Sequence, residues 1–245
     1  MQHAGILAHS VPGAALCFGH FCETAMAELG EHEHPDVTMD CIAMGRSMPA
    51  WEDGDHDAVR AVLASSAARL AAAGCDFFVC PDNTAHLALE RDGADLALPG
   101  LHIAEAVARH AAAAGYRRVG ILGTRWTMEA DLYPRVLAAH GISAGVPDAA
   151  SRDRIQELTF GELTHGLFTD AARAEFVAVI RGLEAAGCEA VALVCTEFPL
   201  LVSPAQSPIP TLESTTLAAE AAVGVALGRD PLPTWRGGPP DGAAA

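Results

Sequence analysis

Short apolar runs alternate with longer segments of helical periodicity along this chain, and turns rich in Gly, Pro, Asn and Asp separate them. The apolar runs predict strands at residues 4–8, 37–44, 77–80, 118–122 and 190–194. The periodic segments predict helices at residues 14–29, 55–73, 103–114 and 171–186, and a last one from residue 214 to about 227. Strands that alternate with helices are typical of an α/β fold with mainly parallel sheets.

Two stretches of the chain match each other without a gap, residues 72–84 and residues 185–197. Eight positions after the glycine that they share, the first has Asp82 and the second Cys195. Residues 4–9 resemble residues 119–124 in the same way. A repeat of this length is too long for a solenoid and indicates two pseudosymmetric lobes. A cleft between the lobes is the natural place for a site.

The repeat and the turn signals set the expected domain boundaries. Lobe 1 takes residues 1–99 and 213–228, and lobe 2 takes residues 100–212. Each lobe is expected to be a mainly parallel sheet flanked by helices. Residues 229–245 are dense in Pro, Gly and Ala and are expected to form a flexible C-terminal tail.

Charge and cysteine content narrow the class of protein. The chain of 245 residues has 15 Lys plus Arg against 31 Asp plus Glu, a formal charge of -16. This balance argues against nucleic acid or an anionic membrane as partner. Seven cysteines are an odd number, and residues 1–30 lack a charged start followed by an apolar core. Reduced thiols and a cytoplasmic location are therefore expected.

No cofactor or metal is expected. His32, His34 and Cys41, and the pair Cys17 and Cys22, lack the paired short spacings of a structural zinc site. A Gly-rich phosphate loop of the usual spacing is also missing. The longest apolar runs are shorter than the roughly 20 residues that span a bilayer.

The chemistry of the repeat centres on Asp82 and Cys195. Their ordinary pKa values are about 3.9 and 8.5, so the resting pair is a carboxylate and a thiol, a base and an acid. The reverse assignment lies roughly 6 kcal/mol higher unless burial raises the pKa of Asp or amide donors lower that of Cys. Each residue has a simpler explanation too: Asp82 caps the following helix, and Cys195 is a small apolar residue, as expected for Cys75 and Cys188.

Three segments together resemble the aspartate/glutamate racemase superfamily: residues 82–86, 120–128 and 187–197. The resemblance covers about residues 4–227, and residues 116–201 look especially like the broad-specificity amino-acid racemase branch. It implies two pseudosymmetric α/β lobes that each contribute a catalytic residue, and no cofactor. It also implies a small carboxylate or amino-acid substrate and a homodimer.

The resemblance also implies roles for particular residues. Cys195 would be the acid/base of the second lobe, with Asp82 as its counterpart. Arg46 and Arg154 lie near the positions where members that recognise acidic side chains have cations, so they would bind the side chain of an acidic substrate. Either arginine can instead serve the fold or face solvent. The full set expected to bind substrate is Asn83, Thr84, Thr124, Thr196, Glu197, Arg46, Arg154 and His9.

Three departures from the family pattern keep other functions open. Asp82 stands where most members have cysteine, residues 8–13 replace a Gly-rich turn with Met, and Ala218 replaces a frequent histidine. A single cysteine also suits one-sided decarboxylases, isomerases or lyases of this superfamily, and a non-catalytic binder of small acids is a third hypothesis. The sequence predicts a racemase or epimerase that moves the proton alpha to a carboxylate between Asp82 and Cys195.

Overall fold

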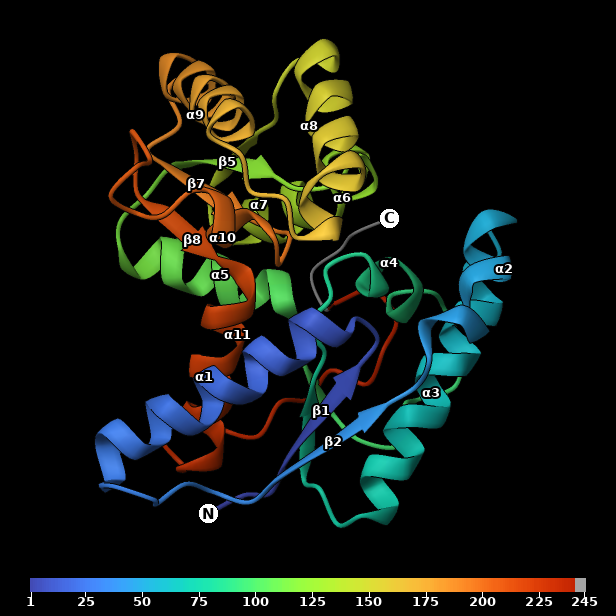
Figure 1. Cartoon of the computed structure of the whole chain (residues 1–245). Helices are drawn as coiled ribbons and strands as arrows, with labels where there is room; N and C mark the ends of the chain where they lie inside the picture. Colours follow the sequence, from blue (N-terminus) through green and yellow to red (C-terminus); the bar gives the residue numbers. More distant parts are fainter. Residues whose placement is uncertain (241–245) are drawn as a thin grey trace. The chain divides into compact units, whose positions relative to one another are not determined.

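The computed structural model describes residues 1–240 of the chain and divides it into two compact units (Figure 1). Unit 1 comprises Met1–Ala106 and the segment that begins at Thr215. Unit 2 comprises Val107–Ser214. Each unit is built on its own four-stranded sheet.

Unit 1 has the strand order β2-β1-β3-β4, and every neighbouring pair is parallel. The strands are β1 (Ala4–Ala8), β2 (Val37–Cys41), β3 (Phe77–Val79) and β4 (Gly100–Leu101). The helices α1 (Val11–Leu29) and α11 (Ser214–Ala226) pack on one face of this sheet. The helices α3 (His56–Ala72) and α4 (Ala85–Leu89) cover the other face. The central strands β1 and β3 are therefore buried on both sides, as strands of parallel sheets usually are, whereas the edge strand β2 is partly exposed.

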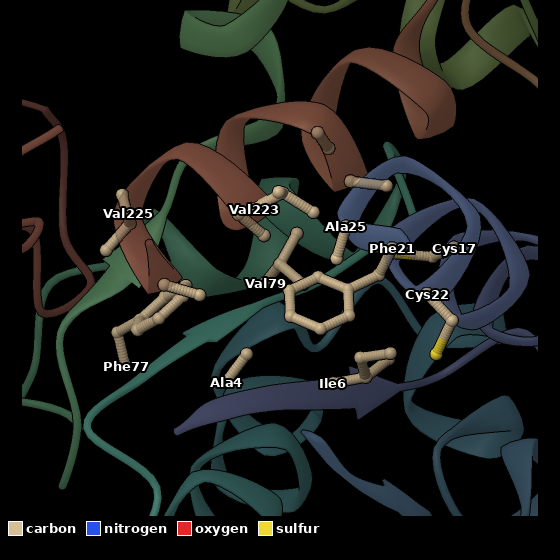
Figure 2. Packing of buried hydrophobic residues seen from close by; sticks show 14 of the residues in the cluster. Ala4, Ile6, Cys17, Phe21, Cys22, Ala25, Phe77, Val79, Val223 and Val225 are labelled. Atoms are coloured by element: carbon tan, nitrogen blue, oxygen red, sulfur yellow. The ribbon is translucent and has the colours of Figure 1, made fainter. Parts of the chain in front are cut away.

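Figure 2 shows how the first of these faces is filled. Phe21 of α1 lies over Ile6 of β1 and Val79 of β3, and Val223 of α11 packs beside it. These four side chains are fully buried. At roughly 25 cal/mol per Å² of apolar surface removed from water, such a cluster supplies much of the stability of the unit. Small residues such as Ala25 let the two helices approach the sheet closely.

Unit 2 repeats the architecture with the strand order β6-β5-β7-β8, again parallel throughout. The strands are β5 (Arg118–Leu122), β6 (Ser143–Gly145), β7 (Ala190–Leu193) and β8 (Thr211–Glu213). The larger helices are α7 (Leu132–Ala139), α8 (Ala149–Gly161) and α9 (Asp170–Ala185). Short helices α6 (Arg125–Glu129) and α10 (Phe198–Leu201) follow β5 and β7, and α5 (Ile103–Ala113) begins in unit 1 and ends in unit 2.

The sheet registers agree with the repeat seen in the sequence. Ala4 pairs with Phe77 in unit 1, and Val119 pairs with Ala190 in unit 2, so each half of the repeat places its first and third strands at the same level. The shared glycines Gly74 and Gly187 both have positive φ, 85° and 88°, after the helix that precedes the strand. An L side chain is strained there, which explains the glycine in both copies. The predicted α/β fold with two related sheets is confirmed.

Two local predictions were wrong, and one helix was not predicted from the sequence. Helix α1 begins at Val11, three residues earlier than expected, because Pro12 fits the first turn of a helix, where no N–H is needed. Strand β2 ends at Cys41, and the short helices η1 (Met44–Arg46) and α2 (Met48–Glu52) follow it. Residues 149–161 form helix α8, although their mixed charges obscure the apolar periodicity.

The C-terminal segment was expected to be a flexible tail from residue 229 onward. In the described part of this segment, Trp235, Arg236 and Gly238 form specific contacts within unit 1. The N–H of Leu96 donates to the Arg236 carbonyl at 2.9 Å, and the N–H of Gly100 donates to the Trp235 carbonyl at 2.8 Å. The Trp235 ring also packs against Phe78. The rest of the expected tail, residues 241–245, lies outside the described residues.

Candidate functional site

The residues singled out from the sequence fall into two groups, one in each unit. The first group follows the ends of β1, β2 and β3, and the second follows β5 and β7, with Arg154 apart on α8. Ligands of open parallel sheets bind at the carboxyl ends of the strands. The two groups therefore occupy the edge of each sheet where such a site is expected.

In unit 1 the parallel register brings His9 to Asp82. Ile6 pairs with Val79 in the sheet, and each of the two polar residues lies three positions beyond its strand partner. The Nδ1 atom of His9 lies 2.7 Å from Oδ2 of Asp82. Both side chains are largely buried, with exposed fractions of 6% for His9 and 12% for Asp82. A buried carboxylate is stable only with such partners.

The second oxygen of Asp82 has a partner in its own loop. Oδ1 accepts a hydrogen bond from the backbone N–H of Ala85 at 3.1 Å, so Asp82 also caps the start of α4, the simpler role considered for it from the sequence. Burial raises the pKa of the Asp82 carboxyl, but the hydrogen bond and charge of His9 and the Ala85 N–H outweigh it. The pKa therefore lies below its ordinary value, and the carboxylate form is favoured.

His86 holds the backbone of the same loop. Its Nδ1 atom lies 2.8 Å from the Asp82 carbonyl, and its Nε2 accepts from the N–H of Ile103 at 3.2 Å. Because Nε2 is an acceptor, Nδ1 carries the proton and donates it. Burial, with the nearby charge of His102, lowers the pKa of His86 to about 3, so the ring is neutral. Trp235 stacks on this ring at a centroid distance of 5.8 Å.

The other predicted residues of unit 1 differ in exposure. Asn83 is buried, Thr84 is half-buried at the start of α4, and Arg46 is exposed in η1. Cys80, two positions before Asp82, has no exposed surface, and burial raises the pKa of its thiol well above the ordinary value. Of the two titratable side chains in this loop, Asp82 is the one that retains access to solvent.

In unit 2 the thiol finds its partner in its own loop. Sγ of Cys195 donates to Oε2 of Glu197 at 3.0 Å, and the hydroxyl of Thr196 donates to the same oxygen at 2.8 Å. All three side chains are half-buried. A hydrogen bond donated by the thiol favours its protonated form. This loop therefore presents a thiol beside a carboxylate.

Thr124 and Arg154, also predicted to bind substrate, lie in different surroundings. Thr124 follows β5 as His9 follows β1, and its hydroxyl lies 3.2 Å from that of Thr127. Arg154 is exposed on α8, and its guanidinium makes two hydrogen bonds to Glu175 of α9 at 2.7 and 2.8 Å. A further bond reaches Glu157 at 3.1 Å. Arg154 thus ties two helices of unit 2 together.

Two residues of the unit 1 group, Ser47 and Trp51, were not predicted from the sequence. Ser47 and Trp51 both reach Nε2 of His9, at 3.0 Å from the serine Oγ and 3.3 Å from the indole Nε1. They belong to the segment after β2, around α2, for which the sequence predicts neither a helix nor a strand. The proximity of parallel strand ends could have indicated the His9–Asp82 contact. Nothing in the local sequence indicates that Trp51 packs against His9.

Two further observations concern metals and membranes. Within residues 1–240 no group of three or more His, Cys, Asp or Glu side chains is arranged to hold a metal ion. No helix in that same range is both long enough and apolar enough to cross a membrane. The absence of a cofactor and of a resident metal stays a prediction of the sequence.

Similar proteins were found by sequence and by structure. The family model for Asp/Glu/Hydantoin racemase matches residues 18–222. The broad-specificity amino-acid racemase RacX of Bacillus subtilis (strain 168) is 25% identical over 179 residues, which cover 71% of this chain and 74% of RacX. A crystal structure of a proposed Asp/Glu racemase from Yersinia pestis superposes with a TM-score of 0.83 at 28% identity, covering 93% of this chain and 100% of that one.

A second solved structure supports the fold alone. The aspartate racemase homologue of Pyrococcus horikoshii OT3 has a TM-score of 0.79 at 23% identity, and the match covers 93% of this chain and 100% of that one. Because the family model spans most of the chain, including the loops after β3 and β7, the match is not confined to one unit. The chain belongs to the Asp/Glu/Hydantoin racemase family.

Proposed function

We propose that the protein is a cofactor-independent amino-acid racemase or epimerase in which Asp82 and Cys195 move the proton alpha to a carboxylate. The observation that carries this proposal is the equivalence of the two loops. Asp82 and Cys195 occupy matching positions after β3 and β7 in two sheets of the same strand order. One bears a carboxylate with a lowered pKa, and the other bears a thiol that donates a hydrogen bond.

The proposed reaction balances one proton on each side of the substrate. Asp82 takes the proton as the Cα–H bond breaks, and the electron pair stays on the carbon next to the substrate carboxylate. Cys195 then delivers its Sγ proton to the opposite face, which leaves a thiolate beside Glu197. The protein returns to its resting state when Asp82 loses its proton and Cys195 regains one, through solvent or the reverse reaction. Family membership and the likeness to RacX favour an amino acid as the substrate.

The substrate carboxylate needs donors near these two groups. We assign this role to Asn83 and Thr84 in unit 1 and to Thr124 and Thr196 in unit 2, all close in sequence to Asp82 or at equivalent strand ends. Arg46, exposed in η1, is the candidate for an acidic side chain. The homodimer and the cytoplasmic location stay predictions of the sequence.

One observation favours a second function, one-sided chemistry such as decarboxylation. A carboxylate with a lowered pKa accepts a proton readily only from a strong acid, and it spends little time protonated. If Asp82 cannot carry the proton, only Cys195 acts on the intermediate, and the product keeps one configuration.

The deciding experiment is proton NMR of L- and D-amino acids with the protein in deuterium oxide, with malonate- and maleate-type acids in the same panel. The racemase proposal expects the α-proton signal to disappear while the opposite enantiomer forms. Product without racemisation would favour the one-sided reaction. Binding without exchange or product would favour a non-catalytic binder and contradict both enzymatic proposals. The same assay is run on Cys195→Ala, which lacks the proposed proton donor. Cys41→Ala, which removes an exposed thiol of unit 1, is its matched control.

A further inference from the structure

Asp82 is connected in unit 1 to a hydrogen-bonded chain of polar side chains, of which His9 and Ser47 are buried and Trp51 is half-buried. His9 Nδ1 lies 2.7 Å from Asp82 Oδ2, and His9 Nε2 lies 3.0 Å from Ser47 Oγ and 3.3 Å from Trp51 Nε1. The Ser47 hydroxyl also reaches the Met44 carbonyl at 2.9 Å. Buried polar groups are costly unless they are hydrogen-bonded, so each link constrains where the protons are.

Asp82 and Trp51 together determine which nitrogen of His9 carries the proton, because the carboxylate can only accept and the indole N–H can only donate. An indole N–H can only donate, so Nε2 must offer its lone pair when the imidazole is neutral. The single proton is then on Nδ1, where it faces Asp82. The Ser47 hydroxyl donates its hydrogen to the Met44 carbonyl, so it does not compete for the Nε2 lone pair.

The order Asp82, His9, Ser47 is that of a serine hydrolase triad, but the exposure of the side chains argues against a serine nucleophile. Ser47 has an exposed fraction of 1%, against 12% for the Asp82 side chain. A nucleophile must reach its substrate, and its hydrogen must be bonded to the base. Here the hydroxyl also has the Met44 carbonyl as acceptor. The accessible end of this chain is the carboxylate.

We propose that His9 is the positioning residue of the Asp82 base and that Trp51, which donates to Nε2, supports the tautomer in which His9 acts. This inference rests on the proposed function, in which Asp82 removes the α-proton. His9 and the Ala85 N–H each occupy one carboxylate oxygen, so the plane of the carboxylate is fixed from two directions. The substrate proton goes to Asp82, and His9 keeps its own.

The proposal predicts a pH effect with a definite sign. The groups around the pair are Ser47 and Trp51 on His9, and His56 against the Trp51 ring. His86 and the Cys80 thiol both lie against the Asp82 backbone. Burial is the largest influence on Asp82 and raises its pKa, and the His9 hydrogen bond and charge are the next and lower it. Without His9, fewer interactions oppose the effect of burial on the pKa of Asp82. The pKa of Asp82 then rises, and the carboxylate protonates at higher pH.

The first experiment needs no substrate. Protein with ¹³C-labelled aspartate carboxyls is titrated by NMR, with Asp82→Asn to assign the signal. We expect the Asp82 midpoint to rise by about one pH unit in His9→Phe, which has no donor. In His9→Asn the side-chain amide can replace Nδ1–H, and the midpoint should stay near that of the wild type. Equal midpoints in wild type and His9→Phe would overturn the proposal.

The second experiment tests Trp51 by ring ¹⁵N NMR of labelled histidine. In the wild type, neutral His9 should carry its proton on Nδ1 with Nε2 unprotonated. In the Asp82→Asn background the side-chain amide can accept from Nδ1 or donate to it, so Trp51 is left as the constraint on the tautomer. Adding Trp51→Phe removes the obligate donor, and the Nε2–H tautomer should then become populated because Ser47 can accept. An Nε2–H tautomer in the wild type, or the same tautomer in Asp82→Asn with and without Trp51→Phe, would overturn the assignment. These variants also keep the test available if His9→Phe fails to fold.

The third experiment separates positioning from folding by kinetics on a substrate found by the exchange assay. His9→Phe should lower kcat about tenfold with KM within twofold, and move the acid limb of the profile to higher pH. In His9→Asn the acid limb of the pH–rate profile should lie at the same pH as in the wild type. His56→Asn, which removes a ring that touches Trp51 but not Asp82, is the control. A uniform loss at every pH in both His9 variants would overturn the proposal. If the wild type exchanges no α-proton, the proposed function fails, and the two NMR experiments still decide the role of His9.

Discussion

The loop after β3 and the loop after β7 hold equivalent positions in sheets of the same strand order, but they hold their titratable side chains differently. Asp82 accepts hydrogen bonds from His9, which follows β1, and from Ala85. Cys195 instead donates to Glu197, two positions further along its own loop. At the position equivalent to His9, unit 2 has Thr124, whose hydroxyl pairs with Thr127.

This difference teaches how a duplicated fold can become chemically asymmetric. The first loop surrounds its side chain with donors, which favours the charged form of an acid. The second gives its side chain an acceptor, which favours the neutral form of a thiol. The common backbone fixes where the two groups lie in each unit, and their immediate neighbours fix which one carries the proton.

The largest expected effect comes from removing the thiol. Cys195→Ala should lower racemisation by about 10²- to 10⁴-fold, because the proton donor of one face is lost. The half-buried position should leave the fold intact, which thermal unfolding would check. Chiral chromatography of the product gives the rate. Turnover at the wild-type rate, with Cys41→Ala as control, would show that the two loops do not share one reaction.

Removing the carboxylate tests the other side of the comparison. Asp82→Asn should slow racemisation by about 10²-fold or more, since an amide cannot accept the α-proton. Exchange in deuterium oxide should be lost for one enantiomer and retained for the other, on which Cys195 acts. Asp57→Asn, at an exposed ion pair with Arg91, is the control. Equal loss of exchange for both enantiomers would contradict the proposal that Asp82 and Cys195 act on opposite faces of the substrate.

Replacing the acceptor of the thiol should make the two loops more alike. Glu197→Gln removes a negative charge beside Cys195, so the thiolate should form more readily. Alkylation of Cys195 by iodoacetamide at neutral pH should speed up about tenfold, with Cys195→Ala giving the background rate. Mass spectrometry of the labelled peptide measures this. Unchanged or slower alkylation would show that Glu197 does not hold the thiol proton.

Much of this comparison could be predicted from the sequence. The match between residues 72–84 and 185–197 aligns Asp82 with Cys195 in the repeat, and the sheet registers agree with this alignment. The alternation of strands and helices was enough for the fold class. These features are encoded locally, in apolar runs and in the glycines that occupy left-handed turns, where other residues are strained.

The partners of the two groups were harder to predict, for a physical reason. Trp51 is 42 positions from His9, and Trp235 lies far from His86 in the sequence, so no local pattern relates them. His9 was expected to bind substrate, whereas its two ring nitrogens face Asp82, Ser47 and Trp51. Side-chain hydrogen bonds between distant segments depend on packing, which periodicity does not describe.

Trp235 braces the first loop in a way that can be measured as stability. Trp235→Ala removes a ring that stacks on His86 and packs against His102 and Phe78. We expect the free energy of unfolding to fall by about 2 kcal/mol, less than for a fully buried Trp, by urea denaturation. Trp126→Ala, at an exposed Trp of unit 2, should change it by about 0.5 kcal/mol at most. Similar values for both variants would contradict a bracing role.

The smallest effect is expected at Arg154, which the sequence offered as a substrate ligand. Its guanidinium is occupied by Glu175 and Glu157 within unit 2, and exposed ion pairs contribute little to stability. Arg154→Ala should therefore leave KM within about twofold and the melting temperature nearly unchanged. Arg46→Ala, measured beside it, should raise KM for an acidic substrate severalfold if that exposed cation binds the side chain. A tenfold rise in KM for Arg154→Ala would mean that the guanidinium leaves Glu175 for the substrate, and unit 2 would then supply the cation that we assign to unit 1.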